Sequence, residues 1–401
     1  MSRMQKRSFG LGVVAISTAL IGSPILDKDP LVWISIPQDA QIKSPVSLKT
    51  ALTTHGLSLA QVPTSQILPL SHWMHETYHR CGGFFYESSL EEAREAIEHP
   101  VAKTSLSYAP QANVAISPLL AQVKEESIRT TIETLAQFQN RLYSSPHGVE
   151  SQKWVMQKWQ EIAAGRNDIT VELVSHTGYI QPSVMLTIRG LGNPNDIVVL
   201  GGHGDSILST SRDPEIRAPG ADDNASGIAT ITEALKILVG NTIRFQKTIK
   251  LFSYAAEEVG LRGSQDIAKS FRKNNLNVKG VMQLDMTNYA GSPFDIVFMT
   301  DYVDTNLTTY LQALLKTHAP EIKWTTDTCG YACSDHASWT RYGYPSSMPF
   351  EARMNEDNPR IHTTRDTLDM SKGRAEHAVS FAKLALAYLM DLGGGEISLD
   401  Q

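Results

Sequence analysis

The second half of the chain contains histidine and acidic residues of the types that bind zinc. The candidates are His203, Asp223, Glu257, Glu258, Asp285 and His362. Zinc accepts imidazole nitrogen and carboxylate oxygen, and a catalytic zinc ion keeps one position open for water. Two zinc ions that lie roughly 3.5–4 Å apart need a bridging carboxylate and can share a hydroxide. The residue types therefore suit two zinc ions (Zn2+) that share one carboxylate.

Four of these candidates lie at or just after the ends of segments whose composition predicts buried strands. His203 comes directly after one apolar run, and Asp285 ends another. Glu257 and Glu258 follow a third run. Ligands of α/β sheets bind outside the carboxyl ends of the strands. We therefore expect side chains that are far apart in the sequence to converge at one edge of a sheet.

Apolar runs alternate with helical patterns over the last two thirds of the chain. We predict strands near residues 169–174, 184–188, 197–201, 249–254, 280–285 and 296–300. We predict helices near residues 225–238, 262–271, 304–315 and 372–392. The first two strands alternate in polarity and fit an antiparallel edge hairpin, whereas the unbroken apolar run before His203 suits a strand buried on both faces. The pattern predicts an α/β domain with a mixed central β-sheet flanked by helices on both faces.

The adjacent acids Glu257 and Glu258 are electrostatically unfavourable next to a buried strand unless a cation lies nearby. Side chains of neighbouring residues diverge, so one acid can bind zinc while the other reaches the metal-bound water. The alternative is an exposed acidic turn that ends at Gly260, and it would be preferred if Asp285 and His362 were absent.

The amino terminus predicts secretion. Basic residues at Arg3, Lys6 and Arg7 precede an uncharged apolar run from Phe9 to Ile21. This pattern is typical of a signal peptide, which we assign to residues 1–22, and the run is too short to span a membrane. We expect a secreted, extracellular protein that has no membrane partner once the signal is removed. The formal net charge of -6 gives no basic excess, so nucleic acid is a poor partner.

The chain between the signal and the α/β pattern is irregular. It contains a strand-like run at 32–36 and a charged helical stretch at 90–98, and a linker that contains Pro and Ala spans residues 107–117. Ser117-Pro118 then predicts the start of a long helix that we extend to Leu142. We expect residues 23–107 to form a propeptide that is removed, and residues 108–401 to form the catalytic domain.

Two of the three cysteines, Cys329 and Cys333, are close in the sequence. In an exported protein such a pair favours a disulfide over a metal site. Closing so short a loop stabilises the fold by about 2 kcal/mol at most, so we expect the bond to stiffen a loop. Cys81 is left over, which suggests that it belongs to the segment that is removed.

From about Ser117 to Leu392 the chain resembles secreted bacterial leucyl aminopeptidases of the co-catalytic dizinc exopeptidase family, especially the marine-bacterial type. The stretches that carry the resemblance are Gly-Gly-His-Gly-Asp (201–205), Pro-Gly-Ala-Asp-Asp-Asn-Ala-Ser-Gly (219–227), Ala-Ala-Glu-Glu-Val-Gly-Leu-Arg-Gly-Ser (255–264), Leu-Asp-Met-Thr-Asn-Tyr (284–289), Cys-Gly-Tyr-Ala-Cys-Ser-Asp-His-Ala-Ser-Trp (329–339) and Asn-Pro-Arg-Ile-His-Thr-Thr (358–364). Short motifs in this order are highly specific. The resemblance implies the phosphorylase/hydrolase-like fold of the zinc exopeptidases.

The resemblance also implies a role for each metal-site residue. His203 and Asp285 would hold one zinc ion, Glu258 and His362 the other, and Asp223 would bridge them. Glu257 becomes the general base, which takes a proton from the metal-bound water and returns it to the leaving amine. Asp205 would orient His203, as metal-bound histidines usually require. The substrates would be peptides with a free amino terminus, and we expect a monomer.

The resemblance further suggests an apolar substrate pocket bordered by the Cys329–Cys333 loop. Its residues would be Met286, Met299, Tyr331, Met348, Phe350 and Ile361. Such a pocket favours leucine and other large apolar side chains, although ordinary core packing explains each residue equally well when it is taken singly. Met354 and Asp357 stand where the family has aromatic residues, so the detailed shape of the pocket differs.

A competing motif lies in the predicted propeptide. His75-Glu76-Thr77-Tyr78-His79 matches the His-Glu-x-x-His pattern of a different class of zinc peptidase. The motif is short, lacks a long flanking helical run and has no convincing third ligand. We therefore interpret residues 68–86 as a propeptide segment whose histidines or Cys81 pack near the mature cleft or block it.

Two alternative functions remain open at this point. The first is a single-zinc acyltransferase on the same scaffold, such as a glutaminyl cyclase, which would bind one zinc ion and release no amino acids. The second is a catalytically silent binding module, which the complete set of candidate ligands argues against.

Overall fold

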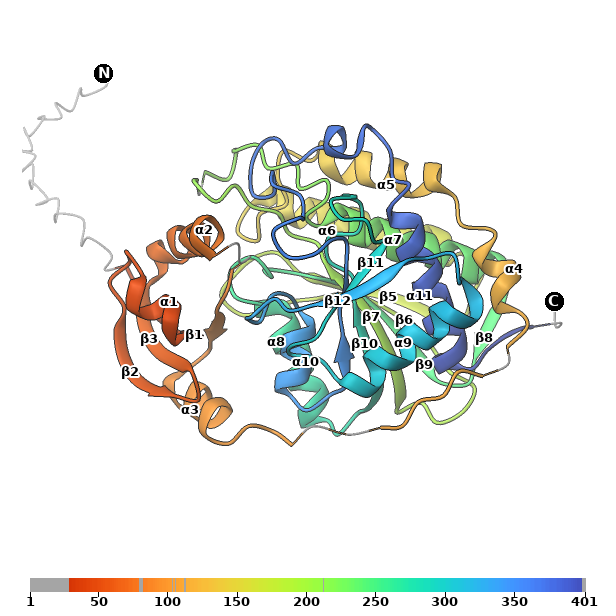
Figure 1. Cartoon of the computed structure of the whole chain (residues 1–401), viewed down its shortest axis with the longest axis horizontal. Helices are drawn as coiled ribbons and strands as arrows, with labels where there is room; N and C mark the ends of the chain where they lie inside the picture. Colours follow the sequence, from red (N-terminus) through yellow and green to blue (C-terminus); the bar gives the residue numbers. More distant parts are fainter. Residues whose placement is uncertain are drawn as a thin grey trace, which may run out of the picture.

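The structure is a computed structural model that describes residues 29–78, 82–102, 104, 106–111, 113–211 and 213–398. It consists of a small N-terminal domain, a linker and a larger body (Figure 1). The predicted signal peptide lies outside the described residues. Within the described ranges, no helix is long and apolar enough to cross a membrane.

A six-stranded mixed sheet forms the centre of the body. Its order is β13-β10-β7-β9-β6-β5, in which β13, β10, β7 and β9 are parallel and the β6–β5 hairpin is antiparallel. The strands are β5 (Ile169–Val174), β6 (Ser183–Ile188), β7 (Asp196–His203), β9 (Thr248–Tyr254), β10 (Asn277–Gln283) and β13 (Ser346–Ser347). The predicted mixed sheet and its antiparallel edge hairpin are confirmed.

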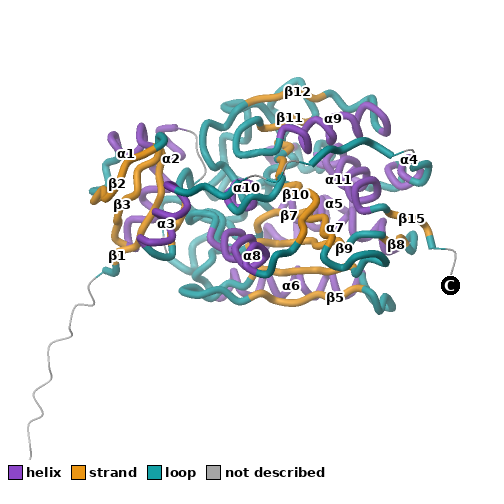
Figure 2. The backbone as a smooth tube through the Cα atoms, turned by 90° about the horizontal axis from the view of Figure 1, so that it is seen from below, coloured by secondary structure: helices purple, strands orange, loops and turns teal. Residues whose placement is uncertain are grey.

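Helices cover both faces of this sheet. Successive residues of a strand point to opposite faces, and β7 carries apolar residues on both. Val198 and Leu200 belong to one apolar core, while Ile197 and Val199 belong to another. The first face packs against α6 (Pro146–Ile162), α7 (Ala225–Gly240) and α11 (Ala378–Gly393), and the second against α8 (Arg262–Lys273) and α10 (His336–Arg341). Figure 2 shows the strands between these helices. The predicted layering is confirmed.

Two features of the helices differ from the prediction. Helix α6 was not foreseen, although Ser145 caps it and Pro146 opens it. The helix predicted to run to Leu142 is broken into α4 (Ile116–Leu120) and α5 (Glu125–Gln137). Arg141 Nη1 donates to the Leu135 carbonyl oxygen at the end of α5. The chain leaves the helical path after Gln137, and the Arg141 guanidinium is buried in the body.

Short sheets outside the central one carry loops of the body. The strand predicted at 296–300 is β11, which pairs with β12 and β14 in a separate three-stranded sheet. Strands β8 and β15 form an antiparallel pair, and α9 packs on α11. The elements are β8 (Ile243–Phe245), β11 (Ile296–Met299), β12 (Trp324–Asp327), β14 (Pro349–Phe350), β15 (Gly395–Ile397), α9 (Thr305–His318) and the 3-10 helix η2 (Leu368–Ser371).

The N-terminal region is an α+β domain rather than an irregular segment. Its antiparallel sheet has the order β2-β3-β1-β4, and α3 packs on β1 and β3. The predicted strand at 32–36 and helix at 90–98 are confirmed. The elements are β1 (Leu31–Pro37), β2 (Lys49–Thr54), β3 (Leu57–Pro63), β4 (Phe85–Glu87), α1 (Gln38–Lys43), η1 (Thr64–Gln66), α2 (Ile67–Tyr78) and α3 (Leu90–Glu98).

The N-terminal domain and the body share one apolar core. Leu142, Ile207, Ala256 and Val259 of the body pack with the buried side chains of the domain's sheet and of α2. All four body residues are almost fully buried. Separation of the domain from the body would therefore expose apolar surface next to the loop that carries Glu257.

The linker lies along the body as an extended strap and joins the domain to α4 (Figure 1). The Thr104 amide donates to the Gly343 carbonyl oxygen at 3.0 Å. Tyr108 stacks on Tyr310 and donates its hydroxyl to the Lys279 carbonyl oxygen at 2.8 Å. The strap is thus anchored to the body at Thr104 and again at Tyr108.

Candidate metal centre

The structure brings the candidate ligands to the carboxyl edge of the central sheet. His203 is the last residue of β7, Asp285 follows β10, and Asp223 directly precedes the cap of α7. Glu257 and Glu258 lie in the loop after β9, and His362 comes from the loop that follows β14. Each of these residues is at most 5% exposed.

The donor atoms form two groups of three that share Asp223. His203 Nε2 lies 3.1 Å from Asp223 Oδ1 and 3.1 Å from Asp285 Oδ1. His362 Nε2 lies 3.1 Å from Asp223 Oδ2 and 2.7 Å from Glu258 Oε2. Among the described residues, these two sets are the groups close enough to hold a metal ion. One Asp223 oxygen thus faces each group, as a bridging carboxylate requires.

The backbone adopts unfavourable conformations at three points of this cluster. Ala256, which precedes Glu257, has φ 55°, Met286, which follows Asp285, has φ 56°, and His362 itself has φ 56°. Non-glycine residues rarely adopt the left-handed region, and such strain is tolerated where the surroundings fix it, often at functional sites. The backbone is therefore held in place where it presents the metal-type side chains.

Asp205 holds the loop that carries the paired glutamates. Its Oδ1 accepts the Glu257 amide at 3.1 Å, and its Oδ2 accepts the Glu258 amide at 3.2 Å. The same Oδ1 lies 3.4 Å from His203 Nδ1. Only the contact with His203 was expected from the sequence. The carboxylate also fixes the direction in which Glu257 and Glu258 leave the backbone.

Arg141 joins two of the ligand loops and was not foreseen. Its Nε donates to the Gly204 carbonyl oxygen at 3.0 Å, and its Nη2 donates to the Gly220 carbonyl oxygen at 2.8 Å. Nη1 donates to the Pro219 carbonyl oxygen at 2.6 Å. The side chain is almost fully buried. It therefore ties the segment after His203 to the segment before Asp223.

A polar network behind Asp223 was also missed. It consists of Asp222, Glu351, Asn358 and Asp366, all of them buried. Asn358 Nδ2 donates to Asp222 Oδ2 and to Asp366 Oδ1. Glu351 accepts the Tyr289 and Asn358 amides. The nearest sequence signal was the density of acids around His362, but exposed acidic loops have the same composition.

The residues predicted to form the substrate pocket lie in one buried apolar cluster. Met286 directly follows Asp285 and Ile361 directly precedes His362, so the cluster borders the candidate ligands. Met354 packs on its edge. The six predicted members are Met286, Met299, Tyr331, Met348, Phe350 and Ile361.

The predicted disulfide between Cys329 and Cys333 is present, and Cys333 belongs to the same cluster. Asp301 positions the disulfide loop, because its two carboxylate oxygens accept the amides of Cys329 at 3.0 Å and Gly330 at 2.7 Å. His336 is a buried residue in the first turn of α10 and belongs to neither metal-holding group of the described residues.

The described part of the competing motif, residues 75–78, lies on α2, whose twelve residues form a longer helix than the sequence suggested. The His75 ring lies 4.9 Å from the His362 ring, measured between centroids. His79 and Cys81 lie outside the described residues. No metal-holding group within the described ranges includes His75 or Glu76. In this part of the chain, the first histidine of the motif is thus adjacent to the main cluster and forms no separate centre.

The mixed sheet and the metal-type cluster at its carboxyl edge are the setting of a metalloenzyme site. The sequence profile of Peptidase family M28 matches residues 183–387, so the chain belongs to this family of peptidases. It is 38% identical over 322 residues to a probable leucine aminopeptidase of Trichophyton verrucosum, and the match covers 77% of this chain and 86% of the relative. The chain is a zinc-dependent metallo-aminopeptidase.

The fold of two solved structures matches that of this protein over nearly the whole chain. The LapA aminopeptidase of Legionella pneumophila matches with a TM-score of 0.80 and 28% identity, over 92% of this chain and 100% of that one. LapB from the same organism matches with a TM-score of 0.80 and 29% identity, over 91% and 100%. The shared part extends beyond the residues of the family profile.

We predict that zinc binding weakens as the pH falls. Burial opposes charge on His203, but the carboxylates of Asp285 and Glu257 outweigh it and raise the pKa of the ring well above its ordinary value. Burial, together with Asp223, raises the pKa of Glu258 to about 7. Protons therefore compete with zinc for both groups. Chelator competition between pH 8 and pH 6 should show affinity falling with pH, whereas a pH-independent affinity would contradict this.

We predict that Arg141→Lys destabilises the body strongly. Lysine keeps the charge but cannot reach several carbonyl oxygens at once, so buried acceptors are left without donors, at a cost of about 3 kcal/mol. The midpoint of urea unfolding should fall accordingly. Arg129→Lys is the matched control, because Arg129 makes surface ion pairs with Glu125 and Glu133. Such pairs contribute little, so the control should leave the midpoint nearly unchanged.

Proposed function

We propose that this protein removes amino-terminal residues from peptides by means of two zinc ions. The observation that carries the proposal is the Asp223 carboxylate, whose two oxygens each face a histidine and a second carboxylate. In this proposal His203 and Asp285 hold one ion, and Glu258 and His362 hold the other. The donor set of two imidazoles and three carboxylates fits zinc.

The bound ions would supply a water of lowered pKa and polarise the scissile carbonyl. Glu257 acts as general base and takes the proton of that water. Its side chain is buried beside the donor groups, and its amide is fixed by Asp205. Burial, reinforced by Asp285 and Glu258 and opposed by His203, raises the pKa of Glu257 well above its ordinary value. The positive charge of bound ions would act against this shift and keep the carboxylate able to accept a proton. Glu257 then gives the proton to the leaving amine.

The preferred amino-terminal residue is leucine or another large apolar one. The apolar cluster around Met286 and Ile361 lies next to the proposed ligands, and burial of a leucine side chain stabilises a complex by about 1.5–3 kcal/mol. The names of the curated relatives, which include leucine aminopeptidases, support the same class of substrate. The surrounding acids favour the free ammonium group of an amino-terminal residue over an internal peptide bond.

We infer that the N-terminal domain is a propeptide that covers the site until it is removed. Helix α2 lies against the proposed metal residues: Ser71 donates its hydroxyl to the Glu258 carbonyl oxygen at 3.3 Å, and His75 packs on His362. His72 Nδ1 lies 2.9 Å from the hydroxyl of Ser209, whose amide donates to the His362 carbonyl oxygen. Secretion by way of a signal peptide at residues 1–22 fits this arrangement.

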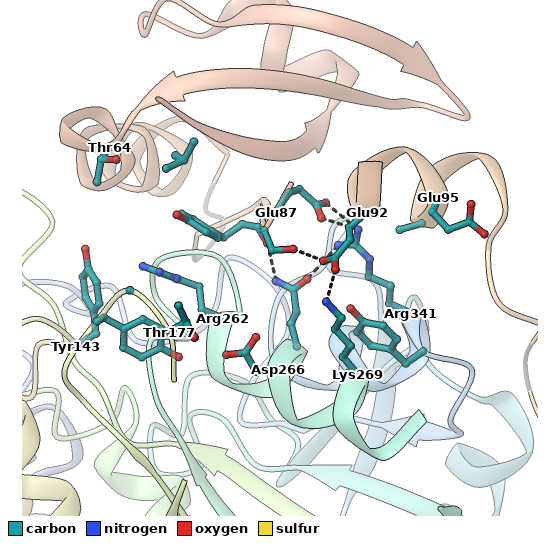
Figure 3. A pocket seen from close by; sticks show the side chains of 18 of the residues that line it. Thr64, Glu87, Glu92, Glu95, Tyr143, Thr177, Arg262, Asp266, Lys269 and Arg341 are labelled. Carbon is teal, nitrogen blue, oxygen red and sulfur yellow. Dashed lines mark hydrogen bonds and ion pairs between the residues drawn. The ribbon is translucent and has the colours of Figure 1, made fainter. Parts of the chain in front are cut away.

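The attachment of the domain to the body includes a cavity and charged side chains as well as the shared apolar core. A cavity of about 680 Å³ lies between domain and body (Figure 3). Beside it, Arg341 Nη2 donates to both Glu87 carboxylate oxygens at 2.8 Å, and Lys269 pairs with Glu92. The guanidinium of Arg262 lies 4.0 Å from the centre of the Tyr86 ring. Cleavage close to Ser107 would leave the strap from Tyr108 onward on the body.

We predict that Glu257→Gln strongly slows hydrolysis while zinc remains bound. Glutamine has nearly the same shape but cannot take the proton, so kcat for a leucine chromogenic amide should fall by about 10²–10⁴-fold. Elemental analysis should still find two zinc ions per chain. The control is Glu126→Gln, at an exposed position in the first turn of α5, which should retain full activity. Unchanged turnover in Glu257→Gln would overturn the proposed role.

We predict that removal of the N-terminal domain activates the enzyme. The cleaved and separated body should hydrolyse the leucine amide at least about tenfold faster than the intact chain, which corresponds to about 1.4 kcal/mol in barrier. Glu87→Gln in the intact chain should raise activity in part, because it weakens the contact with Arg341. Glu91→Gln, at an exposed position of α3, is the matched control. An intact chain that is already fully active would contradict a covering role.

A further inference from the structure

Asp366 accepts hydrogen bonds from the backbone at Asp223, the residue with the shared carboxylate. Its Oδ1 accepts the Asp222 amide at 3.1 Å, and its Oδ2 accepts the Asp223 amide at 3.1 Å. Its own carbonyl oxygen accepts the Ala221 amide at 3.1 Å. Three successive backbone N–H groups before α7 therefore donate hydrogen bonds to the same residue.

Asp366 is itself fixed from the other side. It is fully buried, and Asn358 Nδ2 donates to its Oδ1 at 3.0 Å. It lies four residues after His362 in the same loop. The residue thus connects the loop of one proposed ligand to the backbone of another.

The loop that Asp366 holds has little freedom to take another path. Gly220 has φ 52°, and a Cβ there would lie 2.3 Å from the Asp223 carbonyl oxygen and 2.6 Å from Ser206 Cβ. Arg141 donates to the Gly220 carbonyl oxygen. The amides of Asp222 and Asp223 therefore point at Asp366 in a closely packed turn, and loss of their acceptor leaves buried N–H groups unpaired.

The same device occurs at the neighbouring ligand loop, where Asp205 accepts the amides of Glu257 and Glu258. The two aspartates hold the backbone of different residues. Asp205 holds the proposed general base and a ligand of one ion, whereas Asp366 holds Asp223, the residue that both donor groups share. Asp366 does not belong to either metal-holding group of the described residues, so it acts through Asp223.

We propose that Asp366 is a positioning residue that sets the bridging carboxylate of Asp223 between the two metal positions. The inference rests on the proposed two-zinc site and adds a residue that binds neither metal nor substrate. Because Asp223 is shared, a shift of its backbone moves one oxygen away from each group. Loss of the Asp366 acceptor should therefore weaken both metal positions together.

The test is Asp366→Asn in the full chain. Asparagine keeps the size of the side chain but accepts only one of the two amides and turns a donor toward the other. We expect the affinity of both zinc ions, measured by chelator competition, to fall about 10–100-fold, as for partners of metal ligands. The visible spectrum of the cobalt-substituted protein should change, and kcat for the leucine amide should fall with little change in KM.

Two further variants keep the test decisive. Asp369→Asn, on an exposed position of η2, is the matched control and should bind zinc as the unaltered protein does. Asn358→Ala removes one donor to Asp366 and should weaken both ions in the same direction but less; it carries the test if Asp366→Asn does not fold.

The outcomes separate this inference from the proposed function. Zinc affinities that are unchanged in both Asp366→Asn and Asn358→Ala, or weakening of one ion alone, would overturn the positioning role. So would a lower unfolding temperature of the metal-free protein without loss of zinc affinity. By contrast, an unaltered protein that binds fewer than two zinc ions would refute the proposed function itself, whatever the variants do.

Discussion

The site depends on keeping several carboxylates buried and close together. Burial and mutual repulsion both disfavour charged carboxylates at such distances, so each one must be matched by a cation or by N–H donors. Metal ions would match the carboxylates of the cluster. Backbone amides match the carboxylates behind the cluster, such as Asp366. The buried Arg141 supplies a fixed positive charge near both sets of carboxylates.

Paired backbone amides are the recurring means of fixing these loops. Asp205, Asp366 and Asp301 each accept the amides of two successive residues with their two carboxylate oxygens. One such pair holds the proposed base, one holds the shared ligand, and one holds the disulfide loop beside the apolar cluster. The central sheet brings the loops to one edge. The hydrogen bonds to these carboxylates then fix the path of the loop backbone.

The parts of the fold that follow from local pattern could be predicted. Unbroken apolar runs indicated the strands, and the acids and histidines after them indicated the site. The break between α4 and α5 could not be predicted, because it depends on the contact of the Lys124 amide with Glu233, which is distant in sequence. The end of α5 before Leu142 could not be predicted either, because the Arg141 guanidinium contacts ligand loops that are also distant in sequence. Asp366 and Glu351 were missed for a related reason. An acid in a polar loop has the same sequence pattern whether it is exposed or buried against backbone amides. The N-terminal domain was underestimated because its sheet gains part of its core from body residues such as Ile207, which are distant in sequence.

The anchored strap has a consequence for the chain ends. An enzyme that removes amino-terminal residues is a potential substrate of its own neighbours, since each processed molecule carries a new terminus. A chain that begins at Tyr108 starts at a ring stacked on Tyr310 and bonded to Lys279 in the first half of β10. That is the edge of the sheet opposite the metal residues. If the proposed cleavage close to Ser107 takes place, self-digestion would first require Tyr108 to leave this position, so the anchored strap would protect the proposed mature chain from its own activity.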